Sequence, residues 1–455
     1  MSTAGDLPDL LAWLDGHWNM EALSPGVPQG GSRRTPSLAR MRALLDASAD
    51  PQESYPVLHI TGTNGKTSTA RILASVLAAA GLAVGTTTSP HLERLNERMT
   101  GPPLSPRRRD KSRRRHDHIS DFDLADQLRS LKGVEHLLDD RPSFFDLVVA
   151  CAFRWFADMA VDAAVVEVGL GGRWDSTNVA NGQVAVITNV GLDHTEYLGP
   201  SRADIAREKA GIIKSGAVVV LGETDRELVG IFESTAAQVG ADQVLLLGRD
   251  FEIEANETTL EGRSLDLRTP WGRHSDLLLP LHGRHQGHNA ALAVVAAEAF
   301  FGAALASEVV AEGVADATSP GRLEVVGQDP LIMLDGAHNA DGMAALGRAL
   351  VEELPHLGPA VVVFGTLVGH DPVELLEALG PDRIRLLVAC PAPSPRALSP
   401  DEIADAARSL GIEAVTTPSV EAALEAAVAD AEDDELVLVT GSLYVVGAAR
   451  RLGAG

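Results

Sequence analysis

Short apolar runs alternate with longer amphipathic segments along most of this 455-residue chain. Runs rich in Val, Ile and Leu predict buried strands, whereas apolar residues recurring at helical spacing predict helices. The predicted strands are 57–60, 84–88, 163–168, 184–189, 217–221 and 244–247, and helices such as 68–80 and 145–157 lie between them. This alternation is typical of an α/β fold with a parallel-rich sheet.

The turn-forming sequence Ser319-Pro320-Gly321 divides the alternation into two parts. The first part is expected to begin with helices at 7–14 and 41–45, separated by a polar Gly/Pro-rich segment at 24–36, and to close with a helix from 289 to about 300. The second part has predicted strands at 331–334, 360–364, 384–389 and 435–440 and helices at 342–354, 373–379 and 402–410. We therefore predict two domains, residues 1–318 and a smaller one at 319–455.

Composition narrows the class of protein. With 45% hydrophobic and 22% charged residues, the chain is expected to form a packed core. Cys151 and Cys390 lack the spacing of a metal site, which fits a reducing compartment. We find no signal-like N-terminal segment and no apolar stretch of about 18 residues, so we expect a cytoplasmic protein with no membrane partner.

The formal net charge of −25 disfavours a nucleic-acid partner, because phosphate contacts need a basic face. One segment opposes this trend, the Arg-rich stretch 107–115 within a predicted loop at 101–121. A solvated loop is the simpler interpretation of such a charge run. The alternative is an electrostatic lure for polyanionic substrates, and its deletion would then raise the substrate KM in a salt-dependent way.

A candidate phosphate loop follows the first strand. It consists of Gly62, Thr63, Asn64, Gly65, Lys66, Thr67 and Ser68, and a predicted helix follows. Backbone N–H groups at a helix start bind phosphate oxygens, a Lys ammonium neutralises them, and a hydroxyl ligates Mg²⁺. Ile60 stands where the full phosphate-loop pattern has its first glycine. The alternative is an incidental Gly-rich turn.

Two further polar residues stand at or after the carboxyl ends of predicted strands. Glu167 follows the apolar run 163–166, and His194 follows the strand 184–189. Ligands of open α/β sheets bind at the carboxyl ends of the strands. Taken singly, each residue suits a loop or a helix cap. Together with a phosphate loop, they predict a common site at that edge.

The string 62–67 resembles the nucleotide loop of the Mur ligase superfamily, in which the shortened loop is the rule. Further strings resemble the folylpolyglutamate synthase/dihydrofolate synthase family, in this order: 88–92, 96–98, 167–173, 193–195, 207–212, 320–322 and 335–339. The resemblance covers nearly the whole chain. It implies a P-loop-containing Mur-ligase-type central domain and a smaller Rossmann-like C-terminal domain, the glutamate-ligase domain.

The resemblance also implies an activity. ATP would phosphorylate the carboxylate of dihydropteroate or a reduced folate, and L-glutamate would displace the phosphate. The partners would be these small molecules alone, and the chain would be a monomer. Two alternatives remain, a Mur-type ligase acting on another carboxylate and a non-catalytic nucleotide-binding relative. Against the first we see no uridine-nucleotide domain, and against the second stand Lys66, Glu167, His194 and Lys209.

The site residues are implied by the same resemblance. Two Mg²⁺ ions would be held by Thr67, Ser89, Glu167, His194 and Lys209, the last carbamylated by CO₂. An imidazole is an unusual Mg²⁺ ligand, so the family pattern alone assigns His194 to the metal site. The local sequence of Lys209, between Glu208 and Ala210, would by itself indicate a surface ion pair.

The remaining implied contacts divide between nucleotide and pterin. Asn289 would contact adenine, Arg322 would reach ATP, and Asp335 would hold the ribose or a phosphate-linked water. His338 would lie in the cleft as a fifth catalytic residue beside Lys66, Glu167, His194 and Lys209, with a helix-start histidine as the alternative. The pteroate pocket would be lined by Ser143, Phe144, Phe145, Asp146, Trp174, Asp175 and Ser176. For the two Phe residues, a place in the core is the alternative.

Four positions depart from the family. Thr67 replaces a usual Gly, Ser176 a usual Ala, and Trp174 a smaller aliphatic residue, and these changes are expected to retune the substrate pocket. The segment 366–371 lacks the Lys that is common before its Asp371. The contacts to L-glutamate are therefore left unassigned.

Overall fold

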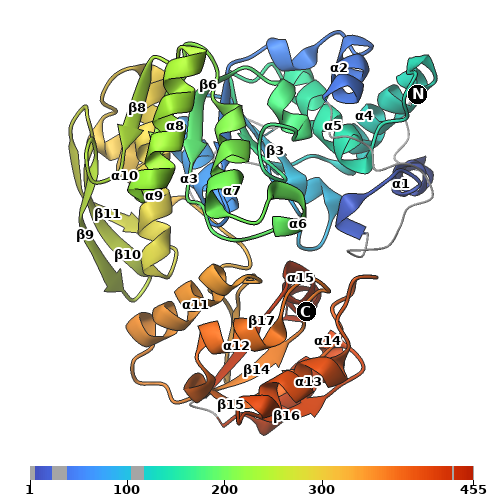
Figure 1. The fold of residues 1–455 in the computed structure, drawn as a ribbon, viewed down its shortest axis with the longest axis vertical. Coiled ribbons are helices and arrows are strands. Elements are labelled where there is room, and N and C mark those ends of the chain that lie inside the picture. The colour runs from blue at the N-terminus through green and yellow to red at the C-terminus, as the bar shows by residue number, and fades with distance from the viewer. Residues whose placement is uncertain (1–5, 23–37, 104–116, 433–434, 454–455) are drawn as a thin grey trace.

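The computed structural model describes residues 6–22, 38–103, 117–432 and 435–453. It consists of two α/β bodies joined end to end, with the chain crossing between them once, near residue 320 (Figure 1). The predicted segments 24–36 and 107–115 lie outside the described residues.

The larger body is built on an eight-stranded sheet of order β4-β3-β2-β5-β1-β6-β7-β8. Six strands are parallel: β2 (Val84–Thr87), β5 (Ala163–Glu167), β1 (Val57–Thr61), β6 (Gly182–Ile187), β7 (Val218–Leu221) and β8 (Gln243–Leu246). The edge strands β3 (Met99–Gly101) and β4 (Asp117–His118) are antiparallel. Because β1 is flanked by β5 and β6, it is buried along its whole length.

Both faces of this sheet are covered by helices, as its apolar strands require. One face packs against α3 (Lys66–Ala79), α9 (Arg284–Phe301) and α10 (Ser307–Ala315). The other face packs against two groups of helices: α1 (Leu7–Asp15), α2 (Ala39–Asp46), α4 (Asp121–Val134) and α5 (Phe144–Asp158), and then α7 (Arg202–Lys209) and α8 (Arg226–Val239), which follow the short α6 (Thr195–Leu198).

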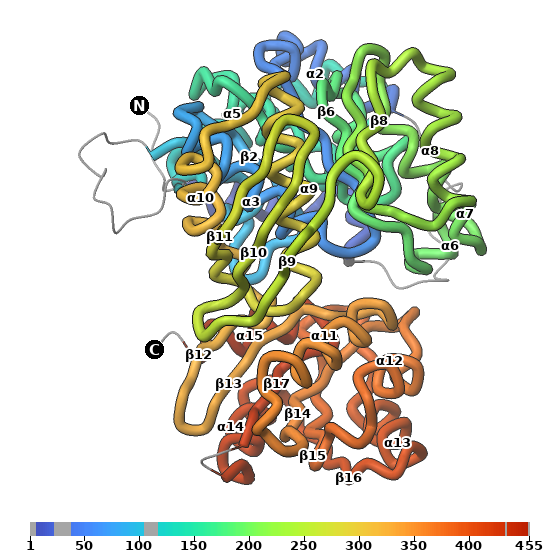
Figure 2. The backbone as a smooth tube through the Cα atoms, turned by 90° about the vertical axis from the view of Figure 1, so that its left-hand side faces the viewer, coloured from blue at the N-terminus to red at the C-terminus, as the bar shows by residue number. Residues whose placement is uncertain are grey.

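A small antiparallel sheet of β9 (Glu252–Thr259), β10 (Gly262–Arg268) and β11 (Arg273–Leu279) was not predicted from the sequence. Its first strand is too polar to stand out as a strand. Leu265 and Leu277 nevertheless fill the core beside α9 and α10. The sheet projects toward the smaller body, as the tube view shows (Figure 2).

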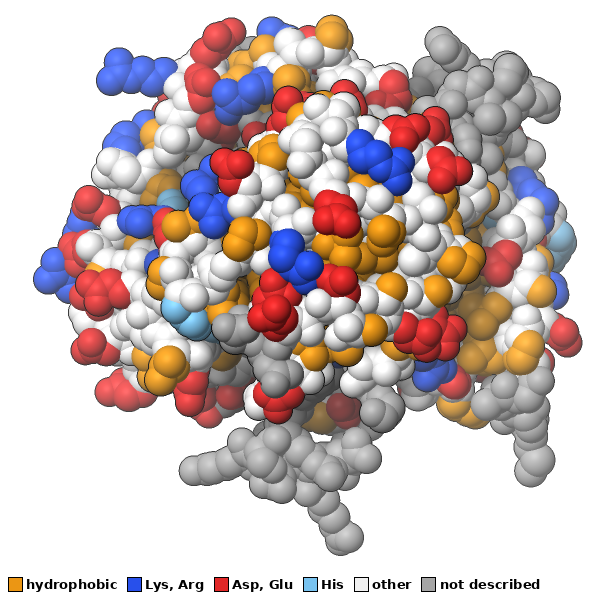
Figure 3. Space-filling view, turned by 90° about the horizontal axis from the view of Figure 1, so that it is seen from below, with side chains coloured by type: hydrophobic (Ala, Val, Ile, Leu, Met, Phe, Trp, Pro, Cys, Tyr) orange, Lys and Arg blue, Asp and Glu red, His pale blue; other side chains and the backbone are white. Residues whose placement is uncertain are grey.

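The smaller body has a six-stranded sheet of order β12-β13-β17-β14-β15-β16. Its strands are β12 (Glu324–Gln328), β13 (Leu331–Leu334), β17 (Leu436–Thr440), β14 (Ala360–Phe364), β15 (Ile384–Ala389) and β16 (Glu413–Thr416), of which only β12 is antiparallel. The covering helices are α11 (Ala340–Glu353), α12 (Pro372–Leu379), α13 (Pro400–Ser409), α14 (Val420–Asp430) and α15 (Leu443–Gly453). The free end of this body carries interspersed acidic, basic and apolar side chains (Figure 3).

Both bodies have the α/β architecture that the sequence predicts, with parallel strands in the interior of each large sheet. Within the described part of the chain, no helix has the length and apolar character needed to cross a membrane.

Ion pairs are among the contacts that join the bodies. Arg263 on β10 lies 2.6 Å from Glu353 at the end of α11, and the same carboxylate accepts from the backbone of Gly283 at 3.0 Å. At the other end of the interface, Arg450 on α15 pairs with Glu93. The side chain of Arg263 is only 2% exposed, so the carboxylate of Glu353 must compensate its buried positive charge.

We predict that Arg263→Ala lowers the free energy of unfolding by about 3 kcal/mol, because it leaves the buried carboxylate of Glu353 without its cationic partner. Arg268→Ala on the same strand is the matched control, since the ion pair between Arg268 and Glu252 is exposed and contributes at most about 1 kcal/mol. Urea unfolding of both variants measures the difference. Equal losses would show that the interface pair is not a stabilising contact.

Candidate functional site

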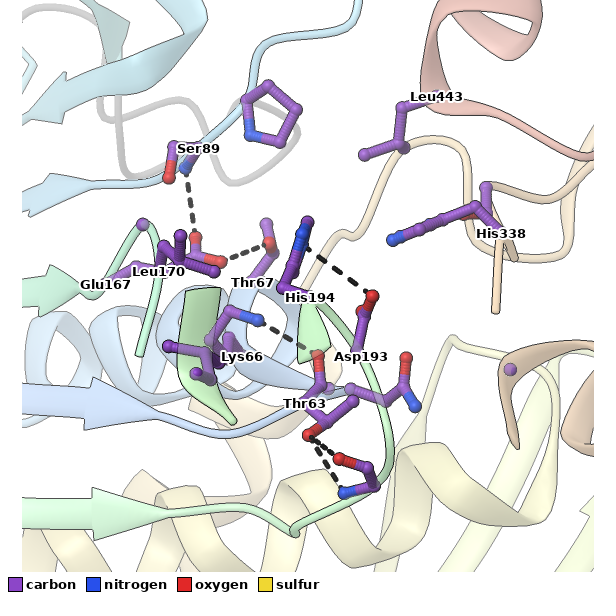
Figure 4. Close-up of a pocket in the computed structure, with 18 of the residues that line it drawn as sticks. Thr63, Lys66, Thr67, Ser89, Glu167, Leu170, Asp193, His194, His338 and Leu443 are labelled. Atoms are coloured by element: carbon purple, nitrogen blue, oxygen red, sulfur yellow. Dashed lines mark hydrogen bonds and ion pairs between the residues drawn. The ribbon is translucent and has the colours of Figure 1, made fainter. Parts of the chain in front are cut away.

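A cleft of about 2200 Å³ lies between the two bodies. Its walls are the loops at the carboxyl ends of β1, β2, β5, β6 and β7 on one side and of β13, β14, β15 and β17 on the other. Parallel strands place all these loops at facing edges of the two sheets. Most of the predicted site residues line this one cleft (Figure 4).

The predicted phosphate loop is the tight turn between β1 and α3. Gly65 has a left-handed φ of 82°, and a Cβ there would come within 2.4 Å of Oδ1 of Asn289. Only glycine tolerates both constraints. The backbone N–H of Thr63 donates to the carbonyl of Asn189 at 3.1 Å, and that of Asn64 donates to the Asn189 side chain at 3.0 Å. The loop is therefore held rigidly, with the first N–H groups of α3 beside the cleft.

Lys66 folds back over this loop. Its Nζ donates to the carbonyls of Gly62 and Thr63 at 2.9 and 3.0 Å. Burial lowers the pKa of Lys66, whereas the carboxylates of Glu167 and Asp193 raise it. The ammonium thus lies between the loop and two acidic groups. The loop residues from Thr63 to Ser68 all line the same cleft.

Three predicted metal-binding residues meet at the end of β5. One carboxylate oxygen of Glu167 accepts from the Thr67 hydroxyl at 2.8 Å, and the other accepts from the backbone N–H of Ser89 at 3.1 Å. Glu167 is only 2% exposed, and burial raises its pKa against the influence of Lys66. Ser68 turns elsewhere, with its Oγ 2.9 Å from Oγ of Ser319. The hydroxyls of Thr67 and Ser89 and the carboxylate of Glu167 are oxygen donors of the kind that a hard cation prefers.

His194 lies on the β6 side of the cleft. It has a left-handed φ of 51°, and its Nε2 is 3.8 Å from Oδ1 of Asp193. Burial lowers the pKa of His194, whereas Asp193 raises it. The described residues contain no cluster of three or more His, Cys, Asp and Glu side chains that would suit a metal ion. A cation at this edge would therefore need hydroxyl ligands and an additional anionic group.

Lys209 ends α7 and is only 3% exposed, next to Glu208, which lines the cleft. Burial, together with the charge of Lys66, holds its pKa well below the usual range, and Asp193 opposes this in part. A surface ion pair is therefore the wrong interpretation of this segment. Its neighbours make the exposed contacts instead, since Arg207 pairs with Asp204. Among the described residues, Lys209 has no carboxylate within ion-pair distance.

The smaller body contributes Arg322, Asp335 and His338. Asp335 is buried and accepts backbone N–H groups of Leu323 at 3.0 Å and Ala337 at 2.9 Å, so it shapes the loop after β13. Burial raises its pKa, and Arg322 lowers it. His338 donates through Nδ1 to the carbonyl of Gly336 at 2.8 Å, which leaves Nε2 for the cleft.

The predicted pterin-pocket residues divide between wall and core. Ser143 and Asp146 form a capping box at the start of α5, and the free Oδ1 of Asp146 accepts from the Ser176 hydroxyl at 2.7 Å. Phe145 and the half-exposed Trp174 line the cleft, with the buried Asp175 behind the loop after β5. Three predicted site residues, Gly62, Phe144 and Lys209, do not line the cleft. Phe144 packs in the core, because neighbouring helix positions point about 100° apart.

Several cleft residues had no predicted role. Asn189 and Asp193 lie around the phosphate loop, and His370 and Arg396 follow β14 and β15. Asn339 does not line the cleft but contacts Asn64 and Asp193 beside it. Burial would raise the pKa of Asp193, but His194, His338 and the amide of Asn339 outweigh it and lower that pKa to about 2. The sequence signal for these residues was their place at or after the carboxyl ends of predicted strands, Asn189 being the last residue of the strand 184–189.

Comparisons with known proteins agree with this architecture. A family model of the Mur ligase middle domain matches residues 147–297, and one of the Mur ligase glutamate ligase domain matches residues 321–443. The chain is 39% identical to dihydrofolate synthase/folylpolyglutamate synthase of Mycobacterium tuberculosis, over 92% of this chain and 91% of that protein. It is 34% identical to folylpolyglutamate synthase of Lacticaseibacillus casei, over 90% and 93% of the two chains.

Solved structures are similar over the whole length. Folylpolyglutamate synthase of Mycobacterium tuberculosis complexed with ADP superposes with a TM-score of 0.88 at 36% identity, covering 99% of both chains. FolC of E. coli in complex with DHPP and ADP gives a TM-score of 0.82 at 28% identity, covering 98% of this chain and 97% of the other.

We predict that Lys209→Met raises the free energy of unfolding by about 1–3 kcal/mol at neutral pH in CO₂-free buffer, because it removes an amine that is costly to bury. The gain should shrink as the pH rises toward the ordinary Lys pKa, where the unfolded chain also carries a neutral amine. Lys214→Met is the control, since Lys214 donates to the carbonyl of Asn178 at 3.2 Å. A loss of stability in Lys209→Met would contradict the assignment of a functional, unpaired amine.

Proposed function

The chain belongs to the folylpolyglutamate synthase/dihydrofolate synthase family, and from that premise we propose how its cleft performs the reaction. The protein is an ATP-dependent ligase that adds L-glutamate to dihydropteroate, to reduced folates or to both. The observation that carries the proposal is the phosphate loop after β1, which faces basic and histidine side chains of the smaller body across one cleft.

The chemistry has two steps. A carboxylate oxygen of the pterin substrate attacks the γ-phosphorus of ATP, and ADP leaves. The amine of L-glutamate then attacks the acyl carbon, an amide bond forms, phosphate leaves with the bridging oxygen, and the amine gives up a proton. The N–H groups of Gly65 and Lys66 and the Lys66 ammonium would stabilise the transferred phosphoryl group.

Mg²⁺ fits the donor set at the end of β5. Thr67, Ser89, Glu167 and His194 would hold it, and when bound it neutralises phosphate charge between nucleotide and carboxylate. Lys209 fits carbamylation, because CO₂ reacts with the neutral form of a buried amine and yields an anionic oxygen ligand. The carbamate would be the additional anion that two Mg²⁺ sites require.

Nucleotide and pterin occupy opposite ends of the cleft in this proposal. Asn289, which backs Gly65, suits adenine, while Arg322 would reach the phosphates and Asp335 would hold the ribose or a phosphate-linked water. Phe145 and Trp174 offer faces to a flat heterocycle, and Asp146 and Ser176 accept and donate hydrogen bonds at its edge. Ser143 and Asp175 fix these groups from behind.

L-glutamate would bind at the carboxyl edge of the smaller sheet. Arg396 lines the cleft, and its Nε is buried without a hydrogen-bond partner among the described residues. His370 lies beside His338, with ring centroids 5.9 Å apart. Burial, and then the charges of His338 and Arg396, lower the pKa of His370, so the guanidinium lies near that imidazole, and such donors together suit a carboxylate. His370 also stands at the position before Asp371 where the family commonly has Lys, so it supplies a donor at that place.

We further propose that residues 1–318 and 319–455 act as two domains of one enzyme, since both supply groups to one cleft. We propose in addition that the enzyme is monomeric and cytoplasmic. Their approach would exclude water from the acyl phosphate, which otherwise hydrolyses.

The direct test is L-glutamate-dependent release of ADP in the presence of Mg²⁺, with dihydropteroate, tetrahydrofolate and a uridine-linked muramyl substrate compared in parallel. Turnover is expected with a pterin substrate and absent in Lys209→Ala. Turnover with the muramyl substrate alone would favour a Mur-type ligase. No turnover from protein that still binds ADP would favour a non-catalytic relative.

We predict that Arg396→Ala raises the KM for L-glutamate roughly 10- to 100-fold, the effect of losing a charge-assisted contact of about 1.4–3 kcal/mol. The KM for the pterin substrate should stay within about threefold, because Arg396 belongs to the smaller body, whereas Phe145 and Trp174 belong to the larger one. Arg408→Ala is the control, since Arg408 pairs with Asp405 on the surface of α13. An unchanged KM for L-glutamate would remove Arg396 from the site.

A further inference from the structure

Asn339, at the start of α11, uses the whole hydrogen-bonding capacity of its side chain. Its Oδ1 accepts from the backbone N–H of Gly342 at 2.8 Å, which caps α11, and from Nδ2 of Asn64 at 3.3 Å. Its Nδ2 donates to Oδ1 of Asn64 at 3.2 Å and to Oδ2 of Asp193 at 3.0 Å. A primary amide offers two donors and two acceptor lone pairs, so all four are satisfied.

Three of these four bonds cross from the smaller body to the larger one. Asn64 belongs to the phosphate loop, and its side chain forms a reciprocal pair with Asn339. Its backbone is already fixed, because its carbonyl accepts from the Thr188 hydroxyl at 2.6 Å and its N–H donates to Asn189. The Asn64 side chain is therefore the part of the loop that meets α11.

Asp193 completes the junction from the loop after β6. The start of α11 lies close against that loop, since a Cβ on Gly191 would come within 2.1 Å of Oδ2 of Asp341. Asn339 is only 4% exposed, so a lost partner there would leave buried polar groups unsatisfied. The contact is short-ranged and directional, and a small shift of α11 would break it.

We propose that Asn339 is a positioning residue that couples the phosphate loop to the smaller body. Through its hydrogen bonds to Asn64 and Asp193, it fixes the position of the L-glutamate side of the cleft relative to the phosphate loop. It touches no reacting atom itself. The inference rests on the proposed ligase function and adds to it the contact that aligns the two halves of the site.

Capping of α11 is the competing role, and two variants separate the roles. Asn339→Ser keeps an N-cap oxygen for Gly342 but is too short to reach Asn64 and Asp193. Asn339→Ala loses both functions. If Asn339 only caps the helix, Ser restores wild-type behaviour and Ala costs stability alone.

The experiment is a double-mutant cycle on the ligase reaction with Asn339→Ser and Asn64→Ala. We expect Asn339→Ser to lower kcat roughly tenfold or more, since misalignment by a fraction of an ångström costs that much. The Kd for ADP should stay within about threefold, because Asn189 holds the loop independently. ADP release should also exceed amide formation, as water reaches the acyl phosphate. The double variant should be no slower than the slower single variant.

The proposal would be overturned if the reductions in kcat of the two single variants multiplied in the double variant. It would also be overturned if Asn339→Ser kept the wild-type kcat and the wild-type ratio of ADP release to amide formation. A wild-type protein without turnover would refute the ligase function instead. Docking is then measured by small-angle X-ray scattering with ADP. Asn339→Ser and Asn64→Ala should each increase the radius of gyration, and the double variant should increase it no further. Unchanged radii would overturn the coupling in that case.

Discussion

The structure depends on one constraint, the burial of β1 between two parallel neighbours. Because β5 and β6 flank it, the chain leaves β1 at the same edge as the ends of those strands. The tight turn at Gly65 then starts α3 at that edge, and Glu167 and Asp193 arrive from either side. The smaller body presents the corresponding edge of its own sheet, so one cleft collects groups from both bodies.

The cleft carries charge at a cost to stability. Glu167 and Lys209 are buried and Lys66 is partly buried, and desolvation shifts the pKa of each toward its neutral form. Lys209 bears this cost without an ion pair among the described residues. Such a concentration of desolvated groups is a poor way to stabilise a fold and is typical of sites that bind charged ligands. In a protein of net charge −25, the local cations also offset an unfavourable mean field for anionic substrates.

Much of the fold was predictable because buried parallel strands are continuous apolar runs. The strands at 331–334, 360–364 and 384–389 match β13, β14 and β15. The antiparallel sheet was missed because β9 is mostly polar, and only tertiary packing buries Leu265. Family strings located most cleft residues. They could not separate Phe145 from the core residue Phe144, nor reveal the Asn64–Asn339 contact, because these depend on helix orientation and on how two distant segments meet.

The central claim is that the substrate carboxylate becomes an acyl phosphate in this cleft. It is tested most directly with a pterin substrate labelled with ¹⁸O in both carboxylate oxygens, using mass spectrometry of the released phosphate. The account predicts one ¹⁸O atom in each phosphate formed during amide synthesis, because the bridging oxygen leaves with phosphorus. Phosphate without label, released in step with amide synthesis, would contradict it.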